Sequence, residues 1–161
     1  MLLSLAFGAR AELWISEILF NPPGGDAPNE YVELRGTPNL LLAAGTYLVA
    51  VEGDTNGNPG TIQNVFDLSG RRLGGNGFLV LLQNGHAYAA HSNSTVVVNS
   101  SGNGFGSGSS STVGHRGEGG QTDLENGSFT FLLIQSTNFP TIGADIDADN
   151  DGTPDGALYA S

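Results

Sequence analysis

The sequence lacks cysteine and lysine, and it has no long apolar run. Without cysteine the chain forms no disulfide and has no thiolate chemistry. All 5 basic residues are arginine, and 16 acidic residues give a formal net charge of -11. Nucleic acids and anionic lipids bind to clustered basic side chains, which are missing here. No segment approaches the ~20 apolar residues of a transmembrane helix. We therefore expect no nucleic-acid partner and no membrane span.

Helical periodicity is also missing. No window of about 11 residues places apolar side chains at helical spacing without an interrupting glycine or proline. Hydrophobic residues nevertheless make up 39% of the chain, which is too many for a disordered protein, and 25 residues are glycine. This combination predicts an all-β protein with long loops rich in glycine and serine.

Short β-prone segments bounded by glycine, proline or asparagine predict the strands. They are residues 13–20, 31–34, 46–51, 78–83, 95–98 and 128–135. Their spacing of about 8 to 15 residues is typical of an antiparallel sandwich. The run 78–83 is almost wholly apolar, so we expect it at the centre of a sheet, buried on both faces.

Two connections can be predicted as well. Asn84 and Gly85 suit a type I′ turn, which would make residues 86–90 the returning arm of a hairpin. Residues 99–114 are almost entirely serine, glycine and asparagine. This composition predicts a mobile loop.

The N-terminus indicates export. An apolar run, residues 1–7, precedes Ala9 and Ala11, which occupy the −3 and −1 positions of a signal-peptide cleavage site before Glu12. We therefore interpret residues 1–11 as a signal-peptide remnant, residues 12–140 as the β-sandwich domain and residues 141–161 as an Asp-rich tail. This division predicts a secreted or cell-surface protein.

The Asp-rich tail contains the one motif with a defined chemistry, which is calcium binding. Carboxylates alternate along the chain, a glycine follows at the sixth position of the loop and another acid stands at the ninth. Calcium takes ~6 to 8 oxygen ligands, and the glycine permits the sharp turn between them. The predicted ligands are Asp147, Asp149, Asp151, Asp155 and the carbonyl of Thr153, with Asp145 as a further candidate.

The motif departs from an EF-hand at its twelfth position, where Leu158 replaces the bidentate glutamate. Residues 147–155 resemble the Asp-rich loops of thrombospondin type 3 repeats, and this resemblance implies an extracellular calcium site of low affinity. A second alternation, Asp54, Asn56 and Asn58, lacks a following acid. An ordinary Asx-rich turn is the better interpretation there.

Residues 13–36 resemble the opening of lamin-tail domains. An Ile-x-Glu-Ile strand leads through Asn21-Pro22 to a strand that ends in Glu33-Leu34. The resemblance implies an immunoglobulin-like β-sandwich, which in bacteria occurs in secreted proteins and is often attached to hydrolases. It implies no catalytic residue, because the lamin-tail module has none.

Active-site patterns are absent or weak. The Ser107 region does not have the spacing of a nucleophile elbow. The three histidines, His86, His91 and His115, are predicted to lie at the surface or in turns, with His115 in a loop fixed by an ion pair. Glu17, Glu30 and Glu33 could supply a carboxylate pair for glycoside hydrolysis, but Glu17 and Glu33 interrupt strands as outward-facing residues do.

These observations favour a non-catalytic, secreted, calcium-binding module with an accessory or structural role. Its expected partner is an extracellular protein or polysaccharide. One alternative is the N-terminal module of a larger exported hydrolase, a nuclease or phosphatase, with its catalytic part downstream. A further alternative is an adhesive protein that pairs through strand edges.

Overall fold

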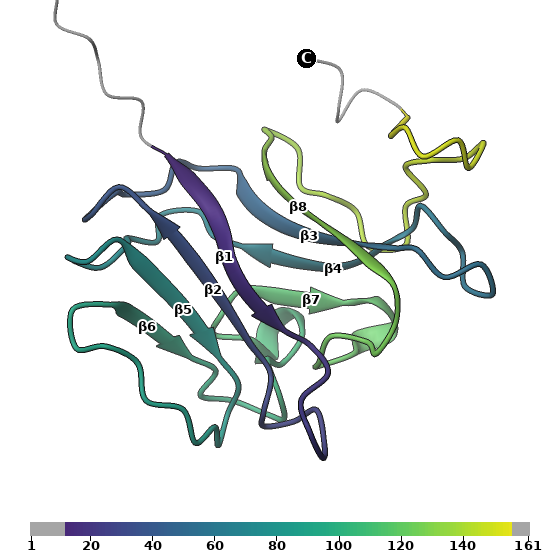
Figure 1. Ribbon diagram of the computed structural model, residues 1–161. Coiled ribbons are helices and arrows are strands. Elements are labelled where there is room, and N and C mark those ends of the chain that lie inside the picture. Colours follow the sequence, from purple (N-terminus) through teal and green to yellow (C-terminus); the bar gives the residue numbers. More distant parts are fainter. Residues whose placement is uncertain (1–11, 156–161) are drawn as a thin grey trace, which may run out of the picture.

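A computed structural model describes residues 12–155 as an all-β sandwich of two four-stranded sheets (Figure 1). The first sheet has the order β1-β2-β5-β6, from strands Leu13–Leu19, Tyr31–Gly36, Phe78–Leu82 and Thr95–Val98. The second has the order β7-β4-β3-β8, from His115–Gly117, Ile62–Asp67, Thr46–Glu52 and Phe129–Gln135. The predicted all-β sandwich is confirmed, and its immunoglobulin-like character stays a prediction. The signal-peptide remnant, residues 1–11, lies outside the described residues.

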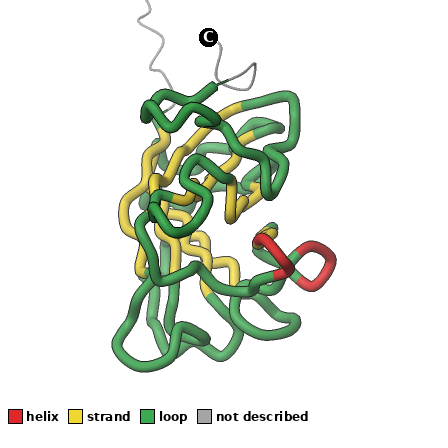
Figure 2. Tube along the Cα trace, turned by 90° about the vertical axis from the view of Figure 1, so that its right-hand side faces the viewer, coloured by secondary structure: helices red, strands yellow, loops and turns green. Residues whose placement is uncertain are grey.

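Helical structure is limited, as predicted. The described part contains two single-turn 3₁₀ segments, Gly108–Ser110 and Glu118–Gly120. Loops make up most of the remaining trace in Figure 2, where these two turns are red. No helix within residues 12–155 is long and apolar enough to cross a membrane.

The main core lies between the two sheets. Alternate residues of each strand point inward, which gives the pattern of buried Val32 and Leu34 on β2 and Leu79 and Leu81 on β5. Across the core, Phe66 of β4 packs edge-on against another aromatic ring at 5.2 Å between centroids. That ring belongs to Phe105, from the segment predicted to be a mobile loop.

The segment 99–114 is irregular, but the prediction that it is mobile is wrong. Phe105 and Val113 have no exposed surface, and Asn99 is also fully buried. The Asn99 side chain donates to the Gly104 carbonyl at 3.0 Å and accepts from the Thr112 N–H at 3.0 Å. Two apolar anchors in a polar run are enough to fix the segment to the core, which composition alone does not reveal.

The predicted hairpin at Asn84-Gly85 is also wrong. Gly85 has a positive φ of 82°, but residues 86–90 form no strand, and β5 pairs with β2 on one side and β6 on the other. The β5–β6 pairing is parallel, with Val80 opposite Val96. The chain therefore crosses over the outer face of the first sheet before it re-enters as β6. The burial of β5 at the sheet centre is confirmed.

The apolar pattern of the sequence does not predict strand β4. Its central residues Gln63 and Asn64 interrupt the apolar pattern, yet both are buried. Gln63 donates to Glu52 at 2.5 Å, and Asn64 lies 2.8 Å from the ring of His115. Polar residues can occupy a buried strand when they find hydrogen-bond partners, and those partners come from distant segments.

Candidate metal centre

The Asp-rich segment is fixed to the end of strand β4. Ile62 N–H donates to the Ala144 carbonyl at 2.9 Å, and Gly143 N–H donates to the Ile62 carbonyl at 2.9 Å. Ile146, which is only 4% exposed, enters a second apolar cluster on the outer face of the second sheet. The predicted acidic loop therefore begins from a fixed base.

Three of the predicted ligands converge. Carboxylate oxygens of Asp147, Asp149 and Asp151 lie within 4.8 Å of one another. Backbone donors hold them in this arrangement: Asp147 accepts from the N–H groups of Asp151 and Gly152, each at 3.0 Å, and Asp151 accepts from Thr153 at 2.7 Å. Gly152 has a φ of 83°, so it makes the sharp turn that the motif predicted.

The other predicted ligands have different positions. Asp145 accepts from the Asp147 N–H at 3.0 Å, and Asp155 accepts from the Ala148 N–H at 3.0 Å. The Asp155 N–H also donates to the Ile146 carbonyl, so Asp155 closes the loop at its base. Neither carboxylate belongs to the group of three. Leu158, at the twelfth position, lies outside the described residues.

Gly60 is the point at which the β3–β4 loop meets the acidic loop. Its N–H donates to the Glu52 carbonyl, and its own carbonyl accepts from the Ile146 N–H, each at 2.9 Å. A Cβ atom at Gly60 would stand 2.8 Å from an oxygen of Asp145 and 3.0 Å from the Cβ of Asp147. Only glycine fits here, and its φ of 87° gives a second reason. The β3–β4 loop and the acidic loop therefore lie closer together than any side chain at position 60 would allow.

The donor set suits calcium. Every candidate ligand is a hard oxygen, and an ionised carboxylate has about four lone-pair positions, so one backbone hydrogen bond leaves capacity for a cation. The three carboxylates are exposed or half-buried, and no arginine lies within the loop. A cation would offset the repulsion between their charges. Three carboxylates with only backbone donors around them would form a calcium site of low affinity.

The second alternation, Asp54 with Asn56 and Asn58, forms an exposed turn between β3 and β4. Asp54 N–H donates to the buried side chain of Glu52 at 2.6 Å, and Gly57 N–H donates to the Asp54 carbonyl at 3.0 Å. Both bonds are local turn bonds, and neither uses the side chain of Asp54, Asn56 or Asn58. Within residues 12–155 this turn contributes no residue to the group of three carboxylates.

Glu30 is a buried carboxyl group whose environment the sequence did not indicate. One oxygen, Oε2, accepts from Gln83 Nε2 at 2.8 Å and from Leu124 N–H at 2.9 Å. The other, Oε1, is buried without a hydrogen-bond partner in the described part of the chain. Burial, reinforced by the charges of Asp123 and Asp26, raises the pKa of Glu30 from 4.5 to about 8. The side chain is therefore neutral at pH 7 and ties three segments together.

His115 is buried, so its prediction as a surface residue fixed by an ion pair is wrong. Its Nδ1 lies 2.6 Å from the Gly106 carbonyl and its Nε2 lies 2.8 Å from Oδ1 of Asn64. Burial lowers the pKa of His115 to about 4, so the ring is neutral and donates one hydrogen. With Nδ1–H donated to Gly106, a half-turn of the Asn64 amide lets its otherwise unpartnered Nδ2 donate to Nε2. His115 is structural.

The fold places the three acids considered for a carboxylate pair at two different locations. Glu30 is interior, whereas Glu17 and Glu33 lie opposite each other on neighbouring strands, on the outer face of the first sheet. His86 and His91 lie in the crossover segment above that face. The structure thus brings Glu17 and Glu33 together on the outer face and places Glu30 in the interior.

Comparison with known proteins gives no significant match to a family model, a curated protein or a solved structure. The lamin-tail and thrombospondin resemblances remain predictions from the sequence. Function is therefore inferred from the geometry of this chain alone.

Proposed function

We propose that this chain is a non-catalytic, exported β-sandwich module that calcium stabilises. The observation that carries the proposal is the convergence of Asp147, Asp149 and Asp151 within 4.8 Å, on a loop fixed to the second sheet. An ion held there would stabilise the loop that is fixed to the second sheet. The acidic composition and the signal-like N-terminus support export, to a compartment where calcium is about millimolar and sites with a Kd of about 10⁻⁴ to 10⁻³ M are occupied.

A binding role is favoured over catalysis by the state of the titratable groups. Within residues 12–155 three groups have strongly shifted pKa values. Burial, followed by the neighbouring Glu17, raises the pKa of Tyr31 to about 12, so its hydroxyl keeps its proton at pH 7. Glu30 and His115 are fully buried and have hydrogen-bond partners on the protein. A general acid or base has to reach a substrate. Their shifts follow from burial in the core and support a structural role for both.

Thermal unfolding with calcium tests the proposal. A ligand that binds only the folded state stabilises it by RT ln(1 + [L]/Kd), which is about 1 to 2 kcal/mol at a few millimolar calcium for a Kd of about 10⁻⁴ to 10⁻³ M. For a chain of this size we expect the Tm to rise by about 3 to 6 °C. Magnesium should have a smaller effect, because it requires a tighter octahedral site.

A matched pair of variants locates the effect. Asp149→Asn removes one carboxylate of the group and should abolish most of the calcium response. Asp54→Asn makes the same charge change in the neighbouring Asx turn and should respond like the wild type. Equal responses in wild type and Asp149→Asn, or no response in the wild type, would refute the proposed site.

A further inference from the structure

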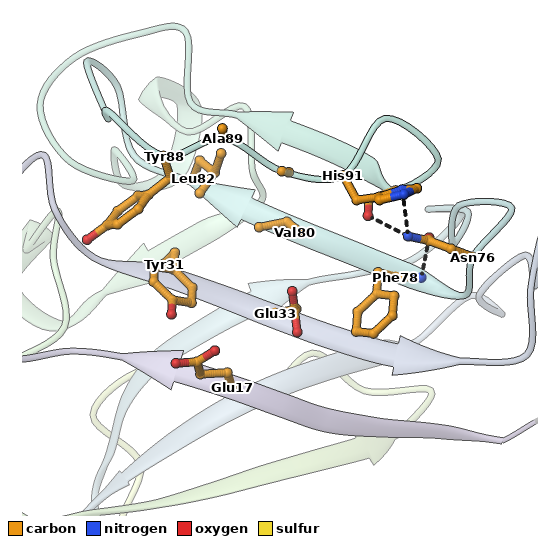
Figure 3. A pocket seen from close by; sticks show the side chains of 12 residues that line it. Glu17, Tyr31, Glu33, Asn76, Phe78, Val80, Leu82, Tyr88, Ala89 and His91 are labelled. Atoms are coloured by element: carbon orange, nitrogen blue, oxygen red, sulfur yellow. Dashed lines mark hydrogen bonds between the residues drawn. The ribbon is translucent and has the colours of Figure 1, made fainter.

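A groove of about 440 Å³ crosses the outer face of the first sheet (Figure 3). Its floor is apolar, because Phe78, Val80 and Leu82 occupy the outward positions of β5. The crossover between β5 and β6 forms one wall, where Tyr88 packs edge-on against Tyr31 at 5.0 Å. The Tyr88 hydroxyl donates to the Asn29 carbonyl, which fixes this wall to the first sheet.

Two carboxylates stand on the opposite side of the groove. Glu17 of β1 and Glu33 of β2 are directly opposite in the antiparallel ladder, next to an irregularity in β1 between Ile15 and Glu17. Ser16 Oγ donates to Glu33 Oε1 at 2.8 Å, so the extra residue of the irregularity orients one carboxylate. Like charges at directly opposite positions destabilise a sheet. This pair therefore has an energetic cost in the free protein.

None of the described arginines forms an ion pair with Glu17 or Glu33. The guanidinium of Arg35 lies over the rings of Trp14 and Phe78, at 6.0 and 5.5 Å. Those of Arg71 and Arg72 donate to backbone carbonyls, and that of Arg116 lies 4.3 Å from the ring of Phe139 on the second sheet. The chain has no lysine. Within residues 12–155, therefore, no arginine or lysine side chain pairs with Glu17 or Glu33, and a partner can supply the cation.

We propose that the groove binds a lysine side chain of a partner polypeptide. The apolar floor suits the four-carbon stem, and the ammonium group would lie between Glu17 and Glu33. Lysine suits the site better than arginine, because a compact ammonium with three rotatable donors can serve two separate carboxylates, whereas a guanidinium prefers one carboxylate held as a bidentate pair. The net charge of -11 also favours a basic partner.

The far end of the groove offers a hydrogen-bond donor for the partner's backbone. His91 Nδ1 accepts from the Asn93 N–H at 3.1 Å, so its Nε2 carries a hydrogen. Nearby, Asn76 is held by its bond to Ser94 Oγ at 2.9 Å. Both side chains line the groove opposite the tyrosines, as Figure 3 shows for Asn76 and His91. The groove thus has a charged side, an apolar floor and a polar end.

Short peptides test the inference. The probes are fluorescein-labelled Gly-Lys-Gly, the same peptide with arginine, and the same peptide with norleucine, which keeps the stem without the charge. Fluorescence polarisation should show the lysine peptide binding at least tenfold more tightly than norleucine and more tightly than arginine. Equal affinity for lysine and norleucine would overturn the proposal. Equal binding of free n-butylammonium and the lysine peptide would also overturn it, because a free amine would then be the ligand. Preferential binding of a neutral polysaccharide such as dextran would overturn it as well.

Matched variants of the protein complete the test. Glu17→Gln and Glu33→Gln should each weaken lysine-peptide binding about tenfold, while Glu125→Gln, the same change at an exposed site elsewhere, should have no effect. Glu33→Gln should also raise the Tm of the free protein, a readout that does not need the ligand. Unchanged peptide affinity in both groove variants would refute the site. The measurements are made with calcium and with EDTA, so failure of the proposed calcium site is distinguished from failure of this one.

Discussion

The outer faces of the two sheets differ in what covers them. On the second sheet, residues after β8 return over the face, and Phe139, Ile142 and Ile146 pack against an apolar cluster that includes Tyr47 and Val49. On the first sheet the crossover covers only part of the face. Val96 and Val98 remain 40% and 38% exposed there, and a groove stays open beside Glu17 and Glu33.

This difference separates two kinds of acidic site. The carboxylates of Asp147, Asp149 and Asp151 are surrounded by backbone N–H donors, an arrangement suited to a small hard cation. Glu17 and Glu33 stand on a sheet beside apolar side chains, an arrangement suited to a cation with an apolar stem. We infer that the chain uses one face to complete its own fold and leaves the other for a partner.

The largest expected effect is the removal of the anchor on the covered face. Ile146→Ala should lower the free energy of unfolding by about 2 to 4 kcal/mol, because the side chain is only 4% exposed and leaves a cavity against the sheet. Val96→Ala on the open face should cost less than about 1 kcal/mol. Urea unfolding of both variants measures the difference. Similar losses would mean that the two faces are equally covered.

The dependence of stability on pH reports on the two buried titratable groups of the interior, Glu30 and His115. Glu30 has a folded pKa of about 8, raised from 4.5, so the stability that it contributes is complete below pH 4.5 and is lost as the pH rises through 8. His115, with its lowered pKa, acts in the opposite direction, but only as the pH falls from 6.5 toward 4. Between about pH 6.5 and 8.5 the wild type should lose roughly 2 kcal/mol of unfolding free energy.

Glu30→Gln should flatten this slope, because glutamine keeps the acceptor for Gln83 and Leu124 without a titrating group. Urea unfolding across the same pH range measures it. A slope that persists in the variant would show that Glu30 is not the group responsible.

The next largest expected effect is that of removing calcium from the acidic loop. Removal of calcium with EDTA should lower the unfolding free energy by about 1 to 2 kcal/mol in the wild type. Gly60→Ala should abolish most of that difference, because the added Cβ would displace Asp145 and Asp147. Gly75→Ala, at a position with open space around its Cβ and no positive φ, is the control. An undiminished calcium response in Gly60→Ala would show that the contact between the two loops does not shape the site.

The smallest expected effect is on the open face. Glu33→Gln should stabilise the free protein by a few tenths of a kcal/mol and up to about 1 kcal/mol, because it removes a like-charge pair. Thermal unfolding at low salt gives the largest signal, since salt screens exposed charges. Destabilisation in this variant would mean that the Ser16 contact outweighs the repulsion.

The sequence predicted the fold class and six of the strands from local pattern, because those strands are apolar runs bounded by turn residues. It could not predict β4, whose buried Gln63 and Asn64 depend on Glu52 and His115. It also placed a hairpin after Leu82, because Asn84-Gly85 is a strong local turn signal. The long-range pairing of β5 with β6 in parallel overrides that signal.

In the acidic loop, too, local interactions could be predicted from the sequence and a long-range contact could not. Three of the predicted ligands, Asp147, Asp149 and Asp151, converge through local bonds, whereas Asp145 and Asp155 lie outside this group. The contact of Asp145 and Asp147 with Gly60 required the fold, because it joins segments about 90 residues apart. Glu17 and Glu33 were recognised as outward-facing residues, but only the β1–β2 register places them opposite each other.

The calcium site can be tested most directly by a crystal structure at about 10 mM calcium chloride with anomalous diffraction data. The account predicts one peak in contact with Asp147, Asp149 and Asp151, with oxygen distances of about 2.3 to 2.6 Å. Clear density for the loop without a peak, or a peak at Asp54 instead, would contradict it.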